Sequence, residues 1–263
     1  MHRLGLAWLL LAMLGSGARA DDPFASYREL FGDDNPAELA VAKGQELWAA
    51  ARGPQGVSLA ACDLGLGPGV VAGAYAALPR YFADAGAVMD LESRLLHCMV
   101  TIQGFSRDEL AAHAFSERGA SQTDLEILAA YVASQSRGAP VDVPQSVREE
   151  RESYARGRRL FYRRSGPYDF ACASCHSLDH RRIRLQELPN LTGEEGARSA
   201  FTHWPAYRIS QGAVRTMQWR MADCVRQQRL PELVLGSQAS VDLITYLGVL
   251  ARGGAMDAPS LRR

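Results

Sequence analysis

The sequence predicts a mainly α-helical protein that consists of two domains related by an internal repeat. Three observations predict this fold: apolar residues recur at helical spacing with little strand-type alternation, three segments occur twice in the same order, and the second copy carries a C-x-x-C-H motif. The chain has 263 residues, of which 47% are hydrophobic and 22% are charged, a composition typical of a globular protein. Its formal net charge is zero, so no basic excess indicates nucleic-acid binding.

The N-terminus is typical of a secretory signal peptide. Residues 1–3 (Met-His-Arg) form a short positive segment, residues 4–15 are apolar, and residues 18–20 read Ala-Arg-Ala, a small-x-small cleavage site. The apolar run is too short to span a bilayer, and acidic residues follow it directly. We therefore expect cleavage after Ala20, export to the periplasm without a membrane span, and an oxidising environment for the five cysteines.

The first repeated segment is a predicted helix at the start of each copy. Residues 42–48 (AKGQELW) correspond to residues 155–161 (ARGRRLF), and both bring an aromatic side chain toward a core. A distance along the chain is also repeated, because Gly44 lies 18 residues before Cys62 and Gly157 lies 18 residues before Cys175.

The second repeated segment aligns without gaps. Residues 78–98 read LPRYFADAGAVMDLESRLLHC, and residues 204–224 read WPAYRISQGAVRTMQWRMADC. Both contain the proline, the tyrosine, Gly-Ala-Val, an arginine four residues before the end, and a terminal cysteine. Short helical matches recur by chance, but a gapless match of this length with a terminal cysteine favours a true repeat.

The third repeated segment closes a helix in each copy. Residues 131–138 (YVASQSRG) correspond to residues 246–253 (YLGVLARG), and each ends in a glycine that would stop the helix. The first of these helices has a capping box at Thr123 and Glu126. The apolar stripes follow helical spacing, with Leu125, Leu128, Ala129 and Val132 in the first copy and Leu243, Leu247 and Leu250 in the second.

These segments predict the domain boundaries. We expect a first domain at residues 21–140 and a second at residues 147–263. A linker rich in turn residues lies between them, at residues 138–144.

The second domain contains the attachment motif of c-type haem at Cys172, Cys175 and His176. Two thiols at this spacing add to the two vinyl groups of the porphyrin, and the adjoining histidine reaches the iron. A redox pair would need a strand–helix context and a zinc site a second ligand pair, and the sequence suggests neither. We therefore expect one covalent haem c and a cytochrome c-like fold.

The first domain lacks this motif. When the repeats are aligned on their glycines, Leu59 stands at the place of Cys172, Cys62 at Cys175, and Asp63 at His176. One thioether cysteine and the iron ligand are thus missing. We therefore expect a cytochrome c-like domain without haem.

The repeat also predicts a disulfide. Cys98 is the counterpart of Cys224, so it would lie near Cys62 once the haem is absent from the first domain. In an exported protein two such thiols are expected to pair, although two buried free thiols are the alternative. A Cys62–Cys98 disulfide would stabilise the domain by about 3–4 kcal/mol in the chain-entropy model.

The second axial position of the haem iron has five candidates, namely Met217, Met221, His180, His203 and Cys224. Methionine is the usual ligand of an electron carrier, but most methionines pack in cores. His180 lies in a charged turn and His203 precedes Trp204-Pro205, which favours a solvated and a structural role, respectively. The repeat favours Cys224, because its counterpart Cys98 ends the same segment.

Arg220 lies four residues before Cys224, which places both side chains on one face of a helix. A guanidinium beside a thiol lowers the thiol pKa, and it can bind a sulfonate in bidentate fashion. Arg94 occupies the matching place in the first domain, so the sequence leaves an ordinary surface arginine open as an alternative.

Taken together, these residues resemble the SoxA family, the catalytic subunits of the SoxAX cytochromes of periplasmic sulfur oxidation. The resemblance rests on the paired domain, on C-x-x-C-H, and on the motif W-R-x-x-x-C-x-x-Q-R at residues 219–229, which here has one additional residue before the final Gln-Arg pair. It covers essentially the whole chain after residue 20. The missing cysteine and histidine of the first domain resemble the single-haem branch of the family.

The resemblance implies an L-cysteine S-thiosulfotransferase that couples thiosulfate oxidatively to a cysteine thiol of the carrier SoxYZ. Cys172 and Cys175 would attach the haem, His176 and Cys224 would be its axial ligands, and Arg220 would bind the substrate. Cys224 would be the catalytic residue and carry an extra sulfur as a persulfide. SoxX would be the partner subunit, and a c-type cytochrome would accept the electrons.

The sequence leaves three alternatives open. One is a plain periplasmic electron-transfer cytochrome, which methionine ligation would support. Another is a structural subunit that docks a redox partner, and the third is a thiosulfate dehydrogenase, whose relatives carry two C-x-x-C-H motifs. How Cys224 reacts is also open, since an iron-bound thiolate is a poor nucleophile and must either dissociate or act through a persulfide.

Overall fold

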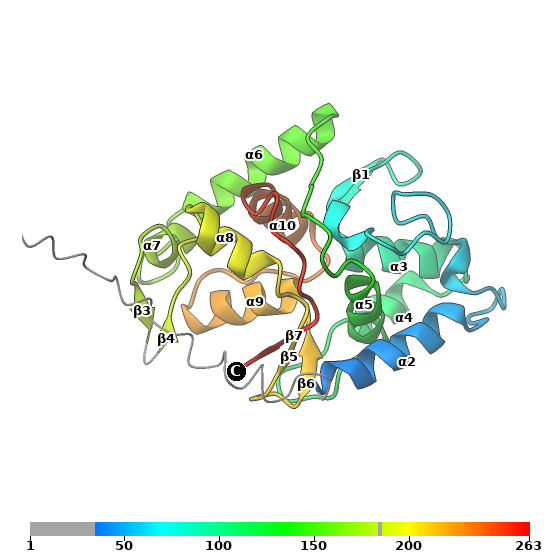
Figure 1. The fold of residues 1–263 in the computed structure, drawn as a ribbon. Coiled ribbons are helices and arrows are strands. Elements are labelled where there is room, and N and C mark those ends of the chain that lie inside the picture. Colours follow the sequence, from blue (N-terminus) through cyan, green and yellow to red (C-terminus); the bar gives the residue numbers. More distant parts are fainter. Residues whose placement is uncertain (1–34, 184–185) are drawn as a thin grey trace, which may run out of the picture. The chain divides into compact units, whose positions relative to one another are not determined.

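The computed structural model of the protein describes residues 35–183 and 186–263, which belong to one compact unit. The signal peptide predicted at residues 1–20 lies outside the described residues. Helices dominate the described part, and its strands are only two or three residues long (Figure 1). The mainly helical fold predicted from the sequence is therefore confirmed. No described helix is long and apolar enough to cross a membrane.

The first half combines α-helices with two short 3-10 helices and a small hairpin. In chain order its described elements are α2 (Ala37–Ala49), η2 (Leu59–Ala61), η3 (Tyr75–Ala77), β1 (Arg80–Phe82), β2 (Ala87–Met89), α3 (Leu91–Thr101), α4 (Arg107–His113) and α5 (Asp124–Ser134). The next helix, α6 (Arg148–Tyr162), follows the predicted linker and opens the second half.

The second half continues from α6 and, like the first, contains a hairpin of two three-residue strands followed directly by a helix. Its further elements are α7 (Cys172–His176), β3 (Arg182–Ile183), β4 (Gln186–Glu187), α8 (Glu194–Phe201), β5 (Ala206–Arg208), β6 (Ala213–Arg215), α9 (Met217–Gln227), α10 (Gln238–Leu250) and β7 (Ser260–Arg262). Strand β5 lies between antiparallel β6 and parallel β7.

In each half the first helix packs against the last through a glycine (Figure 1). Gly44 of α2 faces α5, where a Cβ would lie 2.6 Å from the Cβ of Tyr131. Gly157 of α6 faces α10 in the same way, where a Cβ would lie 2.9 Å from the Cβ of Tyr246. The absent side chain therefore allows the two helix backbones to approach closely at both places.

The gapless segments predicted from the sequence adopt matching structures. In the first half Phe82 pairs with Ala87 across the β1–β2 hairpin, and in the second half Arg208 pairs with Ala213 across β5–β6. Helix α3 begins two residues after its hairpin, as does α9. Residues that differ by 126 in number thus occupy equivalent places in the two segments.

The helix ends follow the capping rules seen in the sequence. The hydroxyl of Thr123 accepts a hydrogen bond from the Glu126 N–H, and the Glu126 carboxylate accepts one from the Thr123 N–H, so the predicted capping box is confirmed. Asp90 caps α3 and Thr216 caps α9, each accepting from the N–H three residues later.

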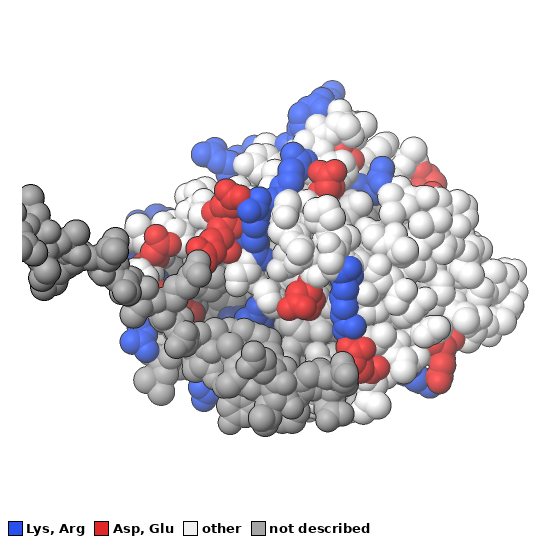
Figure 2. Space-filling model, viewed as in Figure 1, with Lys and Arg blue, Asp and Glu red and all other residues white. Residues whose placement is uncertain are grey.

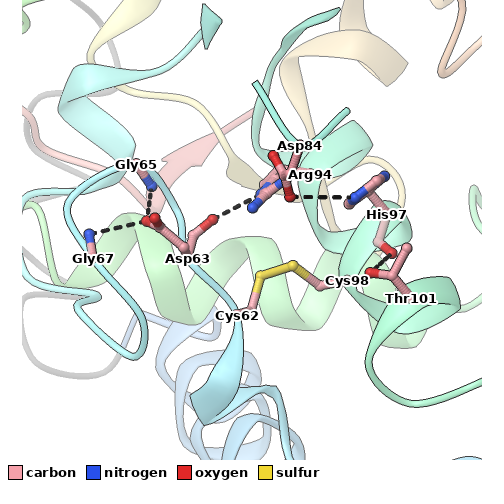
Figure 3. Close-up of a disulfide and its surroundings, with 9 residues drawn as sticks. All are labelled: Cys62, Asp63, Gly65, Gly67, Asp84, Arg94, His97, Cys98 and Thr101. Atoms are coloured by element: carbon pink, nitrogen blue, oxygen red, sulfur yellow. Dashed lines mark hydrogen bonds and ion pairs between the residues drawn. A yellow bond between two sulfur atoms is a disulfide. The ribbon is translucent and has the colours of Figure 1, made fainter. Parts of the chain in front are cut away.

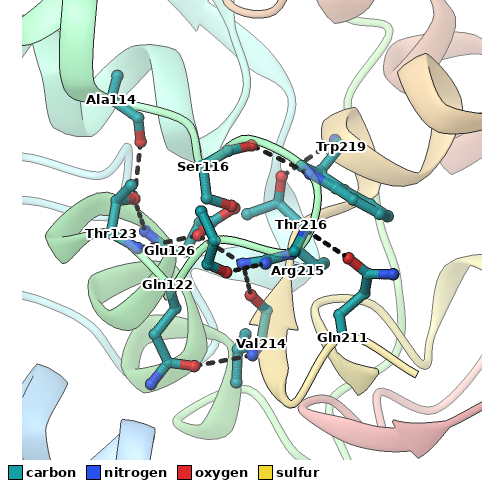
Figure 4. Close-up of polar contacts among 12 residues, drawn as sticks. Ala114, Ser116, Gln122, Thr123, Glu126, Gln211, Val214, Arg215, Thr216 and Trp219 are labelled. Carbon is teal, nitrogen blue, oxygen red and sulfur yellow. Dashed lines mark hydrogen bonds and ion pairs between the residues drawn. The ribbon is translucent and has the colours of Figure 1, made fainter. Parts of the chain in front are cut away.

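A buried polar network joins α5 of the first half to the β6–α9 segment of the second (Figure 4). The carboxylate of Glu126 lies 3.2 Å from the guanidinium of Arg215, and both side chains are fully buried. Ser116 donates a hydrogen bond to Glu126 at 2.7 Å and accepts one from the Trp219 indole at 3.2 Å. This network fixes the start of α9, which carries Arg220 and Cys224.

The disulfide predicted between Cys62 and Cys98 is present, and both cysteines are buried (Figure 3).

Basic and acidic side chains of the described residues are interspersed on the face shown in Figure 2, and neither sign of charge gathers in one region of it. This pattern agrees with the zero net charge of the sequence.

Candidate active site

The C-x-x-C-H residues form the short helix α7. Its start is fixed by Ser174, whose hydroxyl accepts a hydrogen bond from the Ala171 N–H at 2.9 Å. Cys172 and Cys175 are free thiols on this helix, and both are partly buried. Burial raises the pKa of the Cys172 thiol to about 12, so the thiol is neutral at physiological pH.

The ring of His176 is oriented by a backbone contact. Its Nδ1 lies 2.9 Å from the carbonyl oxygen of Pro189, and its own carbonyl accepts a hydrogen bond from the Leu191 N–H at 2.8 Å. With Nδ1 donating to a carbonyl, Nε2 carries the lone pair that binds a metal. Burial lowers the pKa of His176, as does the positive charge of Arg220, and both effects favour the neutral imidazole that a metal requires.

Helix α9 carries Arg220 and Cys224 one turn apart. Cys224 is a free, partly buried thiol that interacts electrostatically with Cys175 of α7 and with Arg220. Burial raises its pKa, and the Arg220 charge offsets this only in part. The Arg220 charge thus acts in the expected direction, but desolvation outweighs it and the net pKa is raised.

A cavity of about 410 Å³ opens between α7, strands β3 and β4, and α9. This volume lies within the range of roughly 300–1,000 Å³ found for small-molecule sites. Its lining includes four residues singled out from the sequence, Cys175, His176, Arg220 and Cys224, and others that were not, among them Arg208 and Ser210. One cavity therefore contains two thiols, an imidazole and four guanidinium groups, since Arg118 and Arg263 also line it.

These residues fit a c-type haem. Cys172 and Cys175 are unpaired thiols at the attachment spacing, and the His176 ring offers Nε2 while Nδ1 is held by a carbonyl. Cys224 lines the same cavity as His176, from a different helix. These residues thus offer two thiols for covalent attachment of haem, the His176 imidazole for the iron, and the Cys224 thiol as a second iron ligand.

The other candidates for an axial ligand do not line this cavity. Met217 is buried in the core, and Met221 packs against it. His180 is exposed and lies 3.0 Å from the Glu187 carboxylate. His203 contacts the carbonyl of Ser199 at 2.7 Å, so it has the structural role expected for it.

Two lining residues, Arg208 and Ser210, were not predicted from the sequence. Both lie in or directly after strand β5, inside the gapless repeat. The signal that would have identified them is the difference between the copies, since Phe82 and Asp84 stand at these places in the first half.

Known proteins are similar to this chain in sequence and in fold. The model of the SoxA/TsdA cytochrome c domain matches residues 43–141. The L-cysteine S-thiosulfotransferase subunit SoxA of Hydrogenophilus thermoluteolus is 46% identical over 275 aligned positions, which cover all of both chains. The subunit of the same name from Hydrogenobacter thermophilus is 34% identical over 87% of this chain and 82% of that protein.

A solved structure agrees with these sequence matches. The crystal structure of SoxXA from P. pantotrophus contains a chain that is 26% identical, with a TM-score of 0.74 over 90% of this chain and 83% of that one. With extensive identity over its whole length and a shared fold, this chain belongs to the SoxA family.

Proposed function

We propose that this protein is the catalytic cytochrome subunit of an L-cysteine S-thiosulfotransferase. The observation that carries the proposal is the placement of Cys224 and Arg220, one turn apart on α9, in the cavity that His176 and Cys175 line from α7. A reactive thiol, an anion-binding guanidinium and a redox-cofactor ligand thus share one site. The relatives that carry the name L-cysteine S-thiosulfotransferase subunit SoxA support this activity.

The architecture we propose is two cytochrome c-like domains, residues 21–140 without haem and residues 147–263 with one covalent haem c. The family match to residues 43–141 supports a cytochrome c-like fold for the first domain. The residues that stand at the places of Cys172 and His176 have structural contacts there, which supports the absence of haem. Leu59 is fully buried, and Asp63 accepts hydrogen bonds from the N–H groups of Gly65 and Gly67 at 2.6 and 2.9 Å.

In the second domain Cys172 and Cys175 would attach the haem, and His176 and Cys224 would be the axial ligands. When bound, the haem supplies a one-electron acceptor that can be reoxidised by a c-type cytochrome. The fold carries these residues on two helices, Cys172, Cys175 and His176 on α7 and Cys224 on α9.

Arg220 orients the substrate in this proposal. Its guanidinium binds the sulfonate oxygens of thiosulfate, which leaves the outer sulfur directed toward the sulfur of Cys224. The thiol of Cys224 and thiosulfate then form a sulfur–sulfur bond and release one proton and two electrons, giving an S-thiosulfonate on Cys224. The electrons leave one at a time to the cytochrome acceptor.

The second step is thiol exchange. The cysteine thiolate of SoxYZ attacks the thiosulfate sulfur that is bonded to Cys224. A new sulfur–sulfur bond forms on the carrier, and the Cys224 thiolate leaves. No electron is lost or gained in this step. We propose SoxX as the partner subunit, in agreement with the structural match to SoxXA from P. pantotrophus, and the periplasm as the compartment.

Transfer to the carrier tests this function. The complex with SoxX is mixed with thiosulfate, oxidised acceptor cytochrome and reduced SoxYZ, and the mass of the carrier peptide is measured. We expect one added thiosulfate group per carrier cysteine and two electrons per transfer, with both lost in Cys224→Ser. Transfer that proceeds unchanged in this variant would contradict the assignment of Cys224. The mass of the resting Cys224 peptide reports whether it carries the persulfide sulfur.

A further inference from the structure

The first half contains a counterpart of Arg220 whose charge is fully satisfied (Figure 3). Arg94 donates from Nη1 to both carboxylate oxygens of Asp84, at 2.9 and 2.8 Å. Its Nε donates to the carbonyl oxygen of Asp63 at 2.7 Å, and its guanidinium lies 4.1 Å from the ring centroid of Phe82. The side chain is only 5% exposed. Arg94 is therefore neutralised by a carboxylate and covered by an aromatic ring.

The matching segment of the second half has the same hairpin register and helix start, with different side chains around its arginine. Because equivalent residues differ by 126 in number, Arg220 takes the place of Arg94, and the hairpin residues can be compared directly. Ser210 stands where the first half has Asp84, and Arg208 stands where it has Phe82. The neutralising carboxylate and the covering ring are thus both missing from these positions, and a second guanidinium is present.

The guanidinium of Arg220 consequently has N–H donors available to bind an anion. Its ion-pair partner within residues 35–183 and 186–263 is Asp223, whose carboxylate lies 3.8 Å away, beyond hydrogen-bonding distance. That carboxylate already accepts hydrogen bonds from Arg226 at 2.8 Å and Gln227 at 2.7 Å. The Arg220 side chain is 30% exposed, against 5% for Arg94, and lines the cavity.

Arg208 brings a second positive charge to the same cavity. Its Nε is buried without a hydrogen-bond partner in the described part of the chain, while its guanidinium lies 5.9 Å from the ring centroid of Trp204. Burial lowers the pKa of Arg208 to about 10, and the charge of Arg220 contributes to the shift. The side chain remains a cation at pH 7. Arg208 and Arg220 are therefore neighbouring cations, in a cavity that Arg118 and Arg263 also line and in which the Asp223 carboxylate is already engaged elsewhere.

We infer that Arg208 and Arg220 together form a subsite for a doubly charged tetrahedral oxyanion, and that Ser210 keeps this subsite open where an aspartate closes it in the first half. Two forks can bind all three oxygens of a sulfonate group, whereas one fork binds two. The inference rests on the proposed function for the identity of the ligand, thiosulfate. Arg208 is then a binding residue that holds the substrate with Arg220.

The test changes Ser210 and Arg208 separately and measures the effect of each change on anion binding. Thiosulfate binding to the haem-loaded protein is measured by isothermal titration calorimetry at low ionic strength, without carrier or acceptor, so that no turnover occurs. Ser210→Asp places a carboxylate where Asp84 stands in the first half, and Ser210→Asn is its uncharged control of similar size. Arg208→Gln removes the second fork, and Arg159→Gln removes one exposed charge on α6 as a control.

We expect Ser210→Asp and Arg208→Gln each to raise the dissociation constant about tenfold or more, since the first competes for the charge-assisted hydrogen bonds to the anion and the second removes some of them. Ser210→Asn adds no charge to the subsite and Arg159 does not line the cavity, so both variants should change the dissociation constant less than about twofold. Equal binding by Ser210→Asp and Ser210→Asn, or wild-type binding by Arg208→Gln, would overturn the inference. Ser210 is exposed, so either substitution leaves the fold intact, as circular dichroism would verify.

This result is independent of the transfer assay. If carrier transfer fails while Ser210→Asp and Arg208→Gln still weaken binding, the anion subsite stands and the proposed reaction is wrong. If transfer succeeds while these variants bind as the wild type does, the reaction stands and the two-arginine subsite is wrong.

Discussion

Replacing Arg215 by methionine should strongly destabilise the protein, because it leaves the Glu126 carboxylate buried without a counter-ion. Both side chains of this pair are fully buried, and they lie 3.2 Å apart. Arg215 also donates a hydrogen bond to the Ala120 carbonyl at 2.5 Å and stacks 5.3 Å from the Trp219 ring centroid. The substitution therefore removes an ion pair, a hydrogen bond and a cation–π contact together.

The magnitude follows from the desolvation of the remaining partner. Removing one member of a buried ion pair costs about 3–5 kcal/mol, more than the pair itself contributes relative to an apolar replacement. Glu126 retains hydrogen bonds from Ser116 at 2.7 Å and from the Thr123 N–H at 2.9 Å, which favours the lower half of this range. We expect Arg215→Met to lower the free energy of unfolding by about 3–4 kcal/mol at pH 7.

The assay is urea unfolding followed by circular dichroism, with Arg215→Met compared with the double variant Glu126→Leu/Arg215→Met. The double variant should recover most of the loss, because no buried charge is left unpaired. Burial already raises the pKa of Glu126, and loss of Arg215 raises it further. The single variant should therefore regain stability as the pH falls and the carboxylate is protonated. A loss below about 1 kcal/mol, or no recovery in the double variant, would refute this reasoning.

Two further predictions concern the first half. The double variant Cys62→Ser/Cys98→Ser should lower the free energy of unfolding by about 4 kcal/mol in urea titrations, because the disulfide closes a loop with a sequence separation of 36. A loss below about 1 kcal/mol would contradict the chain-entropy argument. Burial, with the charge of Asp90 adding to it, raises the pKa of Glu92 from 4.5 to about 8, so the folded state binds one more proton than the unfolded state between these values. Stability should fall as the pH rises through this window, by up to about 1.4 kcal/mol per pH unit, and Glu92→Gln should flatten the profile. An unchanged pH profile in Glu92→Gln would disprove the assignment.

The sequence predicted those features that depend on local pattern. The capping box at Thr123 and Glu126 is set by residues three positions apart, and it is present in the structure. The Cys62–Cys98 disulfide was predicted because the repeat relates Cys62 to Cys175 and Cys98 to Cys224, both of which were expected near the haem. The first prediction needs only local spacing, and the second needs the alignment of the two copies.

Features that depend on contacts between distant segments were not predictable in this way. Glu126 caps its own helix, and nothing near it in sequence indicates that its carboxylate also pairs with Arg215, 89 residues away. The net pKa shift of Cys224 was not predictable for a similar reason, since the sequence shows Arg220 one turn away but not the burial that outweighs its charge. Arg208 was overlooked because a residue of a three-residue strand gives no periodic signal.

Electron paramagnetic resonance of the oxidised, haem-loaded protein tests the central claim most directly, with Cys224→Met measured beside it. If Cys224 is the distal ligand in the active-site cavity, the wild type gives a low-spin signal of the thiolate type, and the variant loses it. A histidine–methionine signal that is the same in both proteins would contradict this account, because it would remove Cys224 from the cofactor and leave an ordinary electron carrier.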